Sequence, residues 1–432
     1  QTANKYIERI KYGNVTPFQE GQNQAEQWLF EVVFDYGEYN LDSDTPYRPV
    51  QSWTNRQDSF STYHAGFEIR THRLCRSILM FHRFEAEFGS EPILVNGTRF
   101  SYDETPIVSL MSGVESVGYS YDNGKYQTKS LPPLEFNYTE FKPTNHAFEP
   151  LLSEKGEFLP GIDLPPNYSL IDLYGEGIPG ILYSDGKTTL YWEPEAKDNG
   201  KDGAAVSYSP PQTPQAFPIE RNVQGATQRL MDLTGNGQMN LVVSRGTTTG
   251  YYEANSDRTW QSFQTFPSFP TDFNNPENQL LDMTGDGLTD ILRMDSDRIW
   301  IYPGKGKEGF GSPFSRNKKN DIPLVRKGSE SEIWQFTDIF GTGMQHLVRV
   351  TNGMVECWPS LGYGKFGQRV LLDHAPRFGK QMDASRLFLA DLDGSGTADL
   401  IYVHSDRVQI WFNQSGNSFS EPITIYLPSK WE

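Results

Sequence analysis

Cysteine is scarce in this chain, since 432 residues contain only Cys75 and Cys357. Two cysteines are too few for a disulfide framework, and they cannot form a zinc site unaided. A free cysteine packs like a small apolar side chain. We therefore expect both residues to lie in the core as small hydrophobic residues.

Long apolar runs are also missing. A membrane-spanning helix needs roughly 20 apolar residues. One of the more apolar stretches, residues 74–84, is interrupted by Arg76, His82 and Arg83. The mean hydropathy of −0.59 agrees with this pattern. We expect a soluble protein that does not insert directly into a membrane.

Basic residues are outnumbered by acidic ones. The chain has 38 Lys and Arg against 55 Asp and Glu, which gives a formal net charge of −17. Nucleic-acid binding draws on clustered Lys and Arg, so this composition argues against a nucleic-acid partner. A large negative charge keeps a protein dispersed and favours a basic docking partner.

Signatures of catalysis are few. The sequence contains no GxSxG, no complete P-loop and no HExxH motif. The segment 175–180, GEGIPG, matches the dinucleotide fingerprint, but it contains Pro179 and an apolar strand rather than a helix is expected to follow it. The seven histidines are not at a spacing typical of a zinc site. Because nothing combines a nucleophile, a base and an oxyanion site, we expect no enzymatic activity in this chain.

What the sequence does contain is a repeat. The pattern Asp, apolar residue, any residue, Gly, any residue, Gly occurs five times, with successive aspartates 60, 50, 56 and 53 residues apart. A near-fixed period in this range indicates one supersecondary unit used repeatedly. The copies are DLYGEG from Asp172, DLTGNG from Asp232, DMTGDG from Asp282, DIFGTG from Asp338 and DLDGSG from Asp391.

Each repeat predicts a β-hairpin with room for more strands. A short apolar strand follows the Gly loop, a polar turn comes next, and an aromatic strand follows, as in Ile181 to Trp192. About 55 residues leave room for two further strands, and four strands form a propeller blade. We therefore predict an all-β fold, a β-propeller of four-stranded blades with Asp-x-x-Gly-x-Gly loops.

The predicted propeller has six blades, with seven as the alternative. Residues 151–432 supply five blades, and the Pro-rich segment 159–166 leads into the first of them. Residues 1–150 lack the motif but contain strand-like runs. We expect them to contribute at least one further blade and to help close the ring, because closure removes exposed strand edges.

The Gly loops offer two interpretations. In the first they are hydrogen-bonded turns, in which Gly adopts positive φ and the leading Asp accepts backbone hydrogen bonds. In the second, oxygens at loop positions 1, 3, 5 and 9, counted from that Asp, hold calcium. The last loop has the best set, and the third loop has a weaker one. The last set is Asp391, Asp393, Ser395 and Asp399, and the third is Asp282, Thr284, Asp286 and Asp290.

The other three loops lack a full set of ligands. The second carries only one charge at these positions, the fourth has Phe340 and His346 at positions 3 and 9, and the first has Tyr174 and Gly180 there. No cofactor is required by this interpretation, and calcium is expected at one or two loops. The five nine-residue loops together contain ten Asp or Glu and no Lys or Arg, so we also expect an acidic ring at one end of the propeller.

The repeats resemble the FG-GAP/VCBS type of integrin-like propellers. Longer strings make the resemblance more specific: in this order they resemble the middle β-propeller of the B component of insecticidal toxin complexes (TcB, TcaC/TcdB-like), over almost the whole chain. The strings are WLFEVVFDYGEYN at 28–40, FSTYHAGFEIRTHRLCRSILMFHRF at 60–84, LPPLEFNY at 131–138, WPSLGYGKFGQRV at 358–370, DLDGSGTADLIY at 391–402 and WFNQSGN at 411–417.

The resemblance implies a function. In that family the B and C components form a hollow shell around a toxic enzyme, and the propeller docks onto the pentameric A component, a membrane-perforating channel. The resemblance therefore implies a secreted docking and gating module that passes the effector into the channel. The abrupt start of the chain agrees with a segment of a longer protein. The alternative is an integrin- or lectin-like propeller that binds a cell-surface protein or a glycan.

One mechanical hypothesis follows from the loops. A propeller that gates must have blades that move between discrete arrangements. The first and fourth repeats have lost the oxygens that could hold calcium. We expect their blades to be less firmly held than the fifth.

Overall fold

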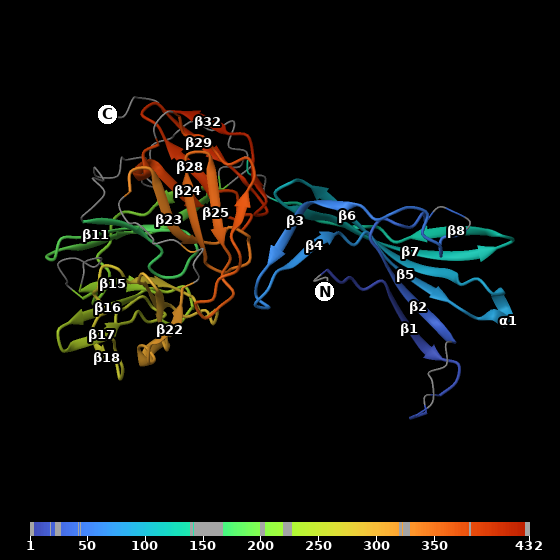
Figure 1. The fold of residues 1–432 in the computed structure, drawn as a ribbon, viewed down its shortest axis with the longest axis horizontal. Helices are drawn as coiled ribbons and strands as arrows, with labels where there is room; N and C mark the ends of the chain where they lie inside the picture. The colour runs from blue at the N-terminus through green and yellow to red at the C-terminus, as the bar shows by residue number, and fades with distance from the viewer. Residues whose placement is uncertain are drawn as a thin grey trace.

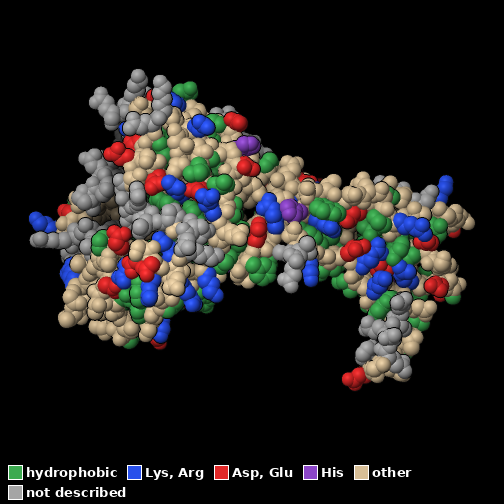
Figure 2. All heavy atoms as spheres, viewed as in Figure 1, with side chains coloured by type: hydrophobic (Ala, Val, Ile, Leu, Met, Phe, Trp, Pro, Cys, Tyr) green, Lys and Arg blue, Asp and Glu red, His purple; other side chains and the backbone are tan. Residues whose placement is uncertain are grey.

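The computed structural model describes residues 4–17, 19–21, 27–41, 43, 45–138, 141, 167–198, 204–218, 227–318, 322, 329–379 and 382–427. Within these residues the regular secondary structure is almost entirely β-strand, and the protein forms two lobes joined at a narrower waist (Figures 1 and 2). The N-terminal lobe is an open sheet, and the C-terminal lobe is a propeller. The predicted all-β class and the β-propeller are thus confirmed.

The N-terminal lobe is built on one seven-stranded antiparallel sheet. Val33, Leu79 and Val117 lie on one line across three of its strands, with Gly97 between the last two. These three side chains are buried on the same face of the sheet, because residues paired across neighbouring strands point to the same face. In spatial order the strands are β1 (Arg9–Asn14), β2 (Trp28–Asp35), β5 (Ser77–His82), β6 (Ile93–Glu104), β7 (Ser109–Asp122) and β8 (Lys125–Ser130), and β9 (Leu134–Glu135) pairs with β7.

Two smaller elements complete this lobe. The hairpin of β3 (Asn55–Thr62) and β4 (Ile69–Arg73) lies on the side of the lobe that faces the propeller, and the short helix α1 (Glu85–Phe88) lies at the far end (Figure 1). Tyr39, Leu41 and Tyr47, from the segment between β2 and β3, cover the core face of the sheet. The lobe therefore has a core of its own.

Five sheets form the propeller, and four of them have four antiparallel strands. The first blade has three strands, and an isolated bridge from Gln212 to Tyr191 continues it beyond its third strand. The four-stranded blades are consistent with the prediction. The strands are β10 (Tyr168–Ile171), β11 (Gly180–Ser184) and β12 (Thr189–Trp192); β15 (Gln228–Met231), β16 (Asn240–Arg245), β17 (Thr248–Tyr252) and β18 (Gln264–Thr265); β19 (Gln279–Leu281), β20 (Asp290–Met294), β21 (Arg298–Tyr302) and β22 (Phe314–Asn317); β23 (Glu332–Thr337), β24 (His346–Thr351), β25 (Met354–Trp358) and β26 (Val370–Leu372); β27 (Leu387–Ala390), β28 (Asp399–Val403), β29 (Arg407–Trp411) and β32 (Ile423–Tyr426).

Short elements lie between these strands. They are the hairpin of β13 (Pro194–Asp198) and β14 (Ala204–Tyr208), the hairpin of β30 (Asn413–Gln414) and β31 (Ser418–Phe419), and the 3-10 turns η2 (Gly306–Glu308) and η3 (Ala384–Arg386).

The propeller core lies between neighbouring blades. The second strand of a blade is apolar on both faces, because each face meets a different neighbour. In β16, Leu241 packs in a cluster with the first blade, and Val242 packs in a cluster with the third. The pairs of second-strand residues that share a buried cluster are Leu182 with Leu241, Val242 with Ile291, Leu292 with Leu347, and Val348 with Leu400.

The predicted number of blades is wrong, since the described part of the chain has five rather than six or seven. The described part of residues 1–150 forms the separate sheet instead of a further blade. Its strands β6 and β7 are 12 and 14 residues long, whereas the strands of the five blades have two to six residues. Alternation alone does not distinguish an open sheet from a blade. The predicted boundary at residue 150 and the Pro-rich segment 159–166 lie outside the described residues.

Two expectations from composition can be compared with the structure. In the described part of the chain, no helix is long and apolar enough to cross a membrane. Cys357 is fully buried, as expected, whereas Cys75 is only half-buried.

The two cores should respond separately to mutation. Leu79→Ala removes a fully buried side chain of the N-terminal sheet, and Leu241→Ala removes one between the first two blades. Each substitution should cost about 2–5 kcal/mol of stability because it leaves a cavity. In hydrogen exchange, Leu79→Ala should reduce protection in β2 and β5 but not in β16 and β20, and Leu241→Ala should do the reverse. Equal losses in both lobes would contradict separate cores.

Candidate functional site: the arc of Asp-Gly loops

The five Asp-Gly loops occupy equivalent places in the five blades. Each loop connects the first strand of its blade to the second, as Asp232 to Gln238 does between β15 and β16. The blades are arranged around one axis, so the loops lie in sequence along one end of the propeller. This arrangement brings together segments that are 50 to 60 residues apart in the sequence.

The Asp at position 1 caps its own loop. Asp232 Oδ1 accepts a hydrogen bond from the N–H of Gly235 at 2.8 Å, and Oδ2 accepts one from Gly237 at 2.7 Å. Both glycines have positive φ, which L side chains rarely adopt. The corresponding acceptors are Asp172, Asp282 and Asp391 in the first, third and fifth loops, and Gly343 donates to Asp338 in the fourth.

Neighbouring loops are joined to one another. In three junctions, the residue at position 8 of one loop donates a hydrogen bond to a carbonyl at position 1 or 2 of the preceding loop. Buried backbone groups need such partners. The bonds run from Met239 N–H to Leu173 O at 3.2 Å, from Thr289 Oγ1 to Asp232 O at 3.1 Å, and from Ala398 N–H to Asp338 O at 2.8 Å.

Close backbone contact accompanies these bonds. A Cβ atom on Gly235 would lie 2.5 Å from the carbonyl oxygen of Gly287 in the next loop. A Cβ atom on Gly341 would lie 3.1 Å from Thr397. Glycine is therefore needed at position 4 of these loops both for its φ and for the contact between blades.

Position 9 ties each loop to the rest of its blade, and it is buried in all five. In the third loop, Asp290 Oδ2 accepts from the N–H of Met283 at 2.9 Å, and Oδ1 accepts from Gly304 at 2.7 Å. In the fourth loop, His346 Nδ1 accepts from the N–H of Ser360 at 2.9 Å. Burial lowers the pKa of His346 to about 3, so the ring is neutral and can act as an acceptor.

The first loop fills the same place from another strand. Its position 9 is Gly180, and a Cβ atom there would overlap the hydroxyl group of Tyr191 from β12. That hydroxyl accepts a hydrogen bond from the N–H of Leu173 at 3.5 Å. Sequence analysis missed this role of Tyr191, although a Gly at position 9 opposite an aromatic third strand is a signal that could have found it.

The first loop also has a cation from the next blade. Arg258, in the turn after β17, forms ion pairs with Glu176 and Glu193, and its guanidinium carbon lies 4.9 Å from the centre of the Tyr174 ring. Arg258 of the second blade therefore neutralises part of the acidic charge near the first Asp-Gly loop.

The fifth loop concentrates carboxylates. Oxygens of Asp391, Asp393 and Asp399 all lie within 4.8 Å of one another. Ligand oxygens around calcium lie 2.3–2.6 Å from the ion, so this spacing fits one shared ion. Three of the four residues predicted for this site are thus brought together. The fourth, Ser395, interacts through its hydroxyl with Thr397 Oγ1 at 2.9 Å.

Asp399 is the member of this group whose charged form is least favoured. It is fully buried, and the loss of hydration raises its pKa to about 7, to which the nearby charges of Asp393 and Asp391 add. Hydrogen bonds from the N–H groups of Leu392 and Asn413, both 2.9 Å long, oppose this shift. Three carboxylates this close repel one another unless a proton or a cation is shared among them.

The third loop is organised differently. Both carboxylate oxygens of Asp290 accept backbone hydrogen bonds, and Thr284 N–H donates to one of them at 2.8 Å. Asp286 Oδ1 accepts from the N–H of Leu288 at 2.9 Å. Among the described residues, Asp282, Asp286 and Asp290 do not form a three-carboxylate group of the kind found in the fifth loop. The third loop therefore fits a cation less well than the fifth.

Comparison with known proteins gives two kinds of match. Residues 1–84 match the family described as Salmonella virulence plasmid 65kDa B protein. A curated relative, mono(ADP-ribosyl)transferase SpvB of Salmonella typhimurium, is 42% identical over 129 residues. That match covers 28% of this chain and 22% of the relative, so the chain spans about a fifth of the relative's length.

Solved structures match almost the whole chain. A chain in the Tc holotoxin pore of Photorhabdus luminescens is 34% identical, with a TM-score of 0.82, and the match covers 99% of this chain and 20% of that one. A chain in the TcdB2–TccC3 complex is 33% identical, with a TM-score of 0.65, and 99% and 21% are covered. The resemblance to the propeller region of toxin-complex B components is thus confirmed.

The expectation of no enzymatic activity in this chain is contradicted by its curated relatives, whose match covers 28% of the chain. The curated relatives that it matches are named mono(ADP-ribosyl)transferases. Signatures of Ser nucleophiles, P-loops, dinucleotide folds and zinc sites do not mark a transferase of this kind, so their absence from the sequence carried no information about this similarity.

The contact between loops can be tested with a pair of glycine substitutions. Gly235 and Gly287 both have positive φ, but a Cβ atom has a close neighbour only at Gly235. Ala at either position should cost about 1–2 kcal/mol for backbone strain. Gly235→Ala should cost about 1–3 kcal/mol more, because the second and third blades must separate. Thermal unfolding of the two variants measures the difference, and equal melting temperatures would exclude a tight contact.

Proposed function

We propose that this chain, similar over almost its whole length to a chain of the Tc holotoxin pore, is the docking and gating propeller of a toxin-complex B component. In this proposal it binds the pentameric A component and opens to pass an effector from a B–C shell into the channel. The observation that carries the proposal is 34% identity over 99% of the chain, with a TM-score of 0.82. The protein would act outside the cell that secretes it.

A difference between the two structural matches supports the gating part. The two chains are almost equally similar in sequence, at 34% and 33% identity, but their TM-scores are 0.82 and 0.65. A difference in shape at constant sequence similarity is expected where a region has more than one arrangement. The present structure is more similar to the chain in the holotoxin pore.

Binding to an A component is the direct test. The complete chain should be retained by an immobilised pentameric A component, and retention should weaken as salt rises because the chain carries a net charge of −17. A chain that is not retained at any salt concentration would refute docking. A glycan array tests the alternative, a propeller that binds a cell-surface glycan.

The fifth loop is the second part of the proposal. Asp391, Asp393 and Asp399, with Ser395 beside them, supply hard oxygen atoms at a spacing that suits calcium. A bound calcium ion would neutralise the three carboxylates and would hold the fifth loop against the fourth, to which Ala398 is hydrogen-bonded. The third loop, with Asp282, Thr284, Asp286 and Asp290, is at most a weaker site.

Calcium and pH should both change the stability of the protein through the carboxylate of Asp399. Without a cation, Asp399 has a pKa of about 7 in the folded protein against 3.8 for an ordinary Asp, so the unfolded chain loses this proton first. Its contribution to stability therefore falls as the pH rises from about 4 to about 7. At pH 7.5 calcium should raise the melting temperature, and chelator should reverse the effect.

Asn240, at position 9 of the second loop, shows that Asn fits this place. Asp399→Asn should abolish the calcium response and this part of the pH dependence. The control Asp286→Asn, in the third loop, should keep both. If calcium does not change the melting temperature of the unmodified chain, the loops are only hydrogen-bonded turns.

A further inference from the structure

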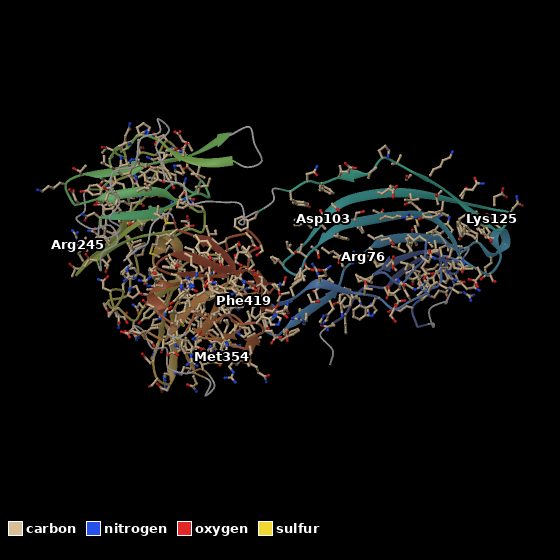
Figure 3. The ribbon with its side chains drawn as sticks, turned by 90° about the horizontal axis from the view of Figure 1, so that it is seen from above. Arg76, Asp103, Lys125, Arg245, Met354 and Phe419 are labelled. Carbon is tan, nitrogen blue, oxygen red and sulfur yellow. The ribbon has the colours of Figure 1, made fainter. Side chains whose placement is uncertain are left out.

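The two lobes meet at the fourth and fifth blades. The segment after β3 places Tyr63 against the fourth Asp-Gly loop, and Tyr63 is only 5% exposed. It belongs to the same buried cluster as Ile339, Val348 and Trp411 of the propeller. Figure 3 shows Phe419, another member of this cluster, on the side of the propeller that faces the N-terminal lobe. The core of the fourth and fifth blades therefore includes a residue of the N-terminal lobe.

The contact uses two of the positions at which the fourth loop differs from the fifth, positions 3 and 9. Phe340 at position 3 lies 5.2 Å from Tyr63 between ring centres, and His346 at position 9 lies 6.0 Å from it. Phe340 and His346 also contact each other at 4.9 Å with their rings nearly perpendicular. The three rings form one packed group, which we call the Tyr63 joint. Carboxylates at positions 3 and 9 would place charges against the Tyr63 ring in a buried site.

Polar contacts surround the Tyr63 joint. His64 Nε2 is 2.8 Å from the carbonyl oxygen of Thr342 in the same loop. Asn417, from the turn between β30 and β31, donates to the carbonyl oxygen of Ser59 at 2.7 Å and accepts from Arg70. Together these bonds connect the propeller to both strands of the β3–β4 hairpin and to the segment between them.

A second point of attachment lies nearby. Ser415 Oγ donates to the carbonyl oxygen of Ile107 at 2.7 Å, and the Ile107 side chain packs in a cluster with Val408, Ile410 and Phe412. Two separate segments of the N-terminal lobe therefore contact the propeller, one at the fourth and fifth blades and the other at the fifth blade. Two attachments restrict rotation, whereas a single one would allow the lobes to turn about it.

We propose that the fourth Asp-Gly loop is the docking site of the N-terminal lobe, and that Tyr63 is the residue that fixes the orientation of this lobe on the propeller. Phe340 and His346 serve this contact in place of the oxygen ligands found in the fifth loop. The fourth blade is therefore held by the other lobe. The expectation that this blade is less firmly held than the fifth stays a prediction, and the contact with Tyr63 gives the blade a support that does not involve calcium. The proposal does not depend on the toxin-complex function.

Tyr63→Ala tests the joint, with Tyr121→Ala as the matched control on the same lobe. Tyr121 is 41% exposed, lies on β7 and packs against Tyr126 of the same sheet. In the complete chain, Tyr63→Ala should reduce hydrogen-exchange protection of the N–H groups of residues 338–346 by about tenfold or more. Small-angle X-ray scattering should give a larger radius of gyration. Tyr121→Ala should change neither quantity.

Phe340→Asp approaches the same contact from the propeller side. It restores the residue type of position 3 in the fifth loop and should loosen the lobes as Tyr63→Ala does, while β16 and β20 keep their exchange protection. Unchanged scattering and exchange in both variants would overturn the proposal. If Tyr63→Ala does not fold, Phe340→Asp decides alone: unchanged exchange at residues 338–346 and unchanged scattering in that variant would overturn the proposal.

Discussion

The propeller depends on one constraint, the close approach of backbone between the Asp-Gly loops of successive blades. A carboxylate at position 1 holds the loop N–H groups, and glycine at position 4 leaves no side chain between neighbouring loops. Only then can position 8 of one loop bond the carbonyl of the preceding one. At three junctions this contact is made whether or not an ion is bound.

Position 9 shows how the same structural task is performed by different chemistry. Asp290, His346 and Asp399 all accept a hydrogen bond from the N–H group fourteen residues further along, and Tyr191 fills the corresponding space in the first blade. Where the residue is Asp, its burial is unfavourable for the charged form. The third loop balances that charge with three backbone donors, whereas the fifth has two and adds two further carboxylates. The fifth loop therefore carries more uncompensated carboxylate charge than the third.

The repeat was sufficient to predict the propeller, the five blades that carry it, and the carboxylate group of the fifth loop. It did not predict the fold of the first 138 residues, because alternating apolar residues mark a half-buried strand in any sheet. The lengths of β6 and β7, which separate an open sheet from a blade, depend on pairing between distant strands. The hydrogen bonds that Asp290 accepts from backbone N–H groups also could not be predicted from the sequence. Its partners Met283 and Gly304 are brought next to it only in the folded loop.

The departures from the motif carry as much information as its conserved positions. Judged only by the side-chain oxygens that could bind calcium, the fourth loop is a poor copy of the motif. In the folded protein its Phe340 and His346 form an apolar surface that a carboxylate would destroy, and Tyr63 buries that surface. A loop cannot hold both an ion and an aromatic ring at the same positions. One loop type therefore presents either a group of carboxylates or an aromatic surface, and the fourth and fifth blades, which are hydrogen-bonded to each other, carry one of each.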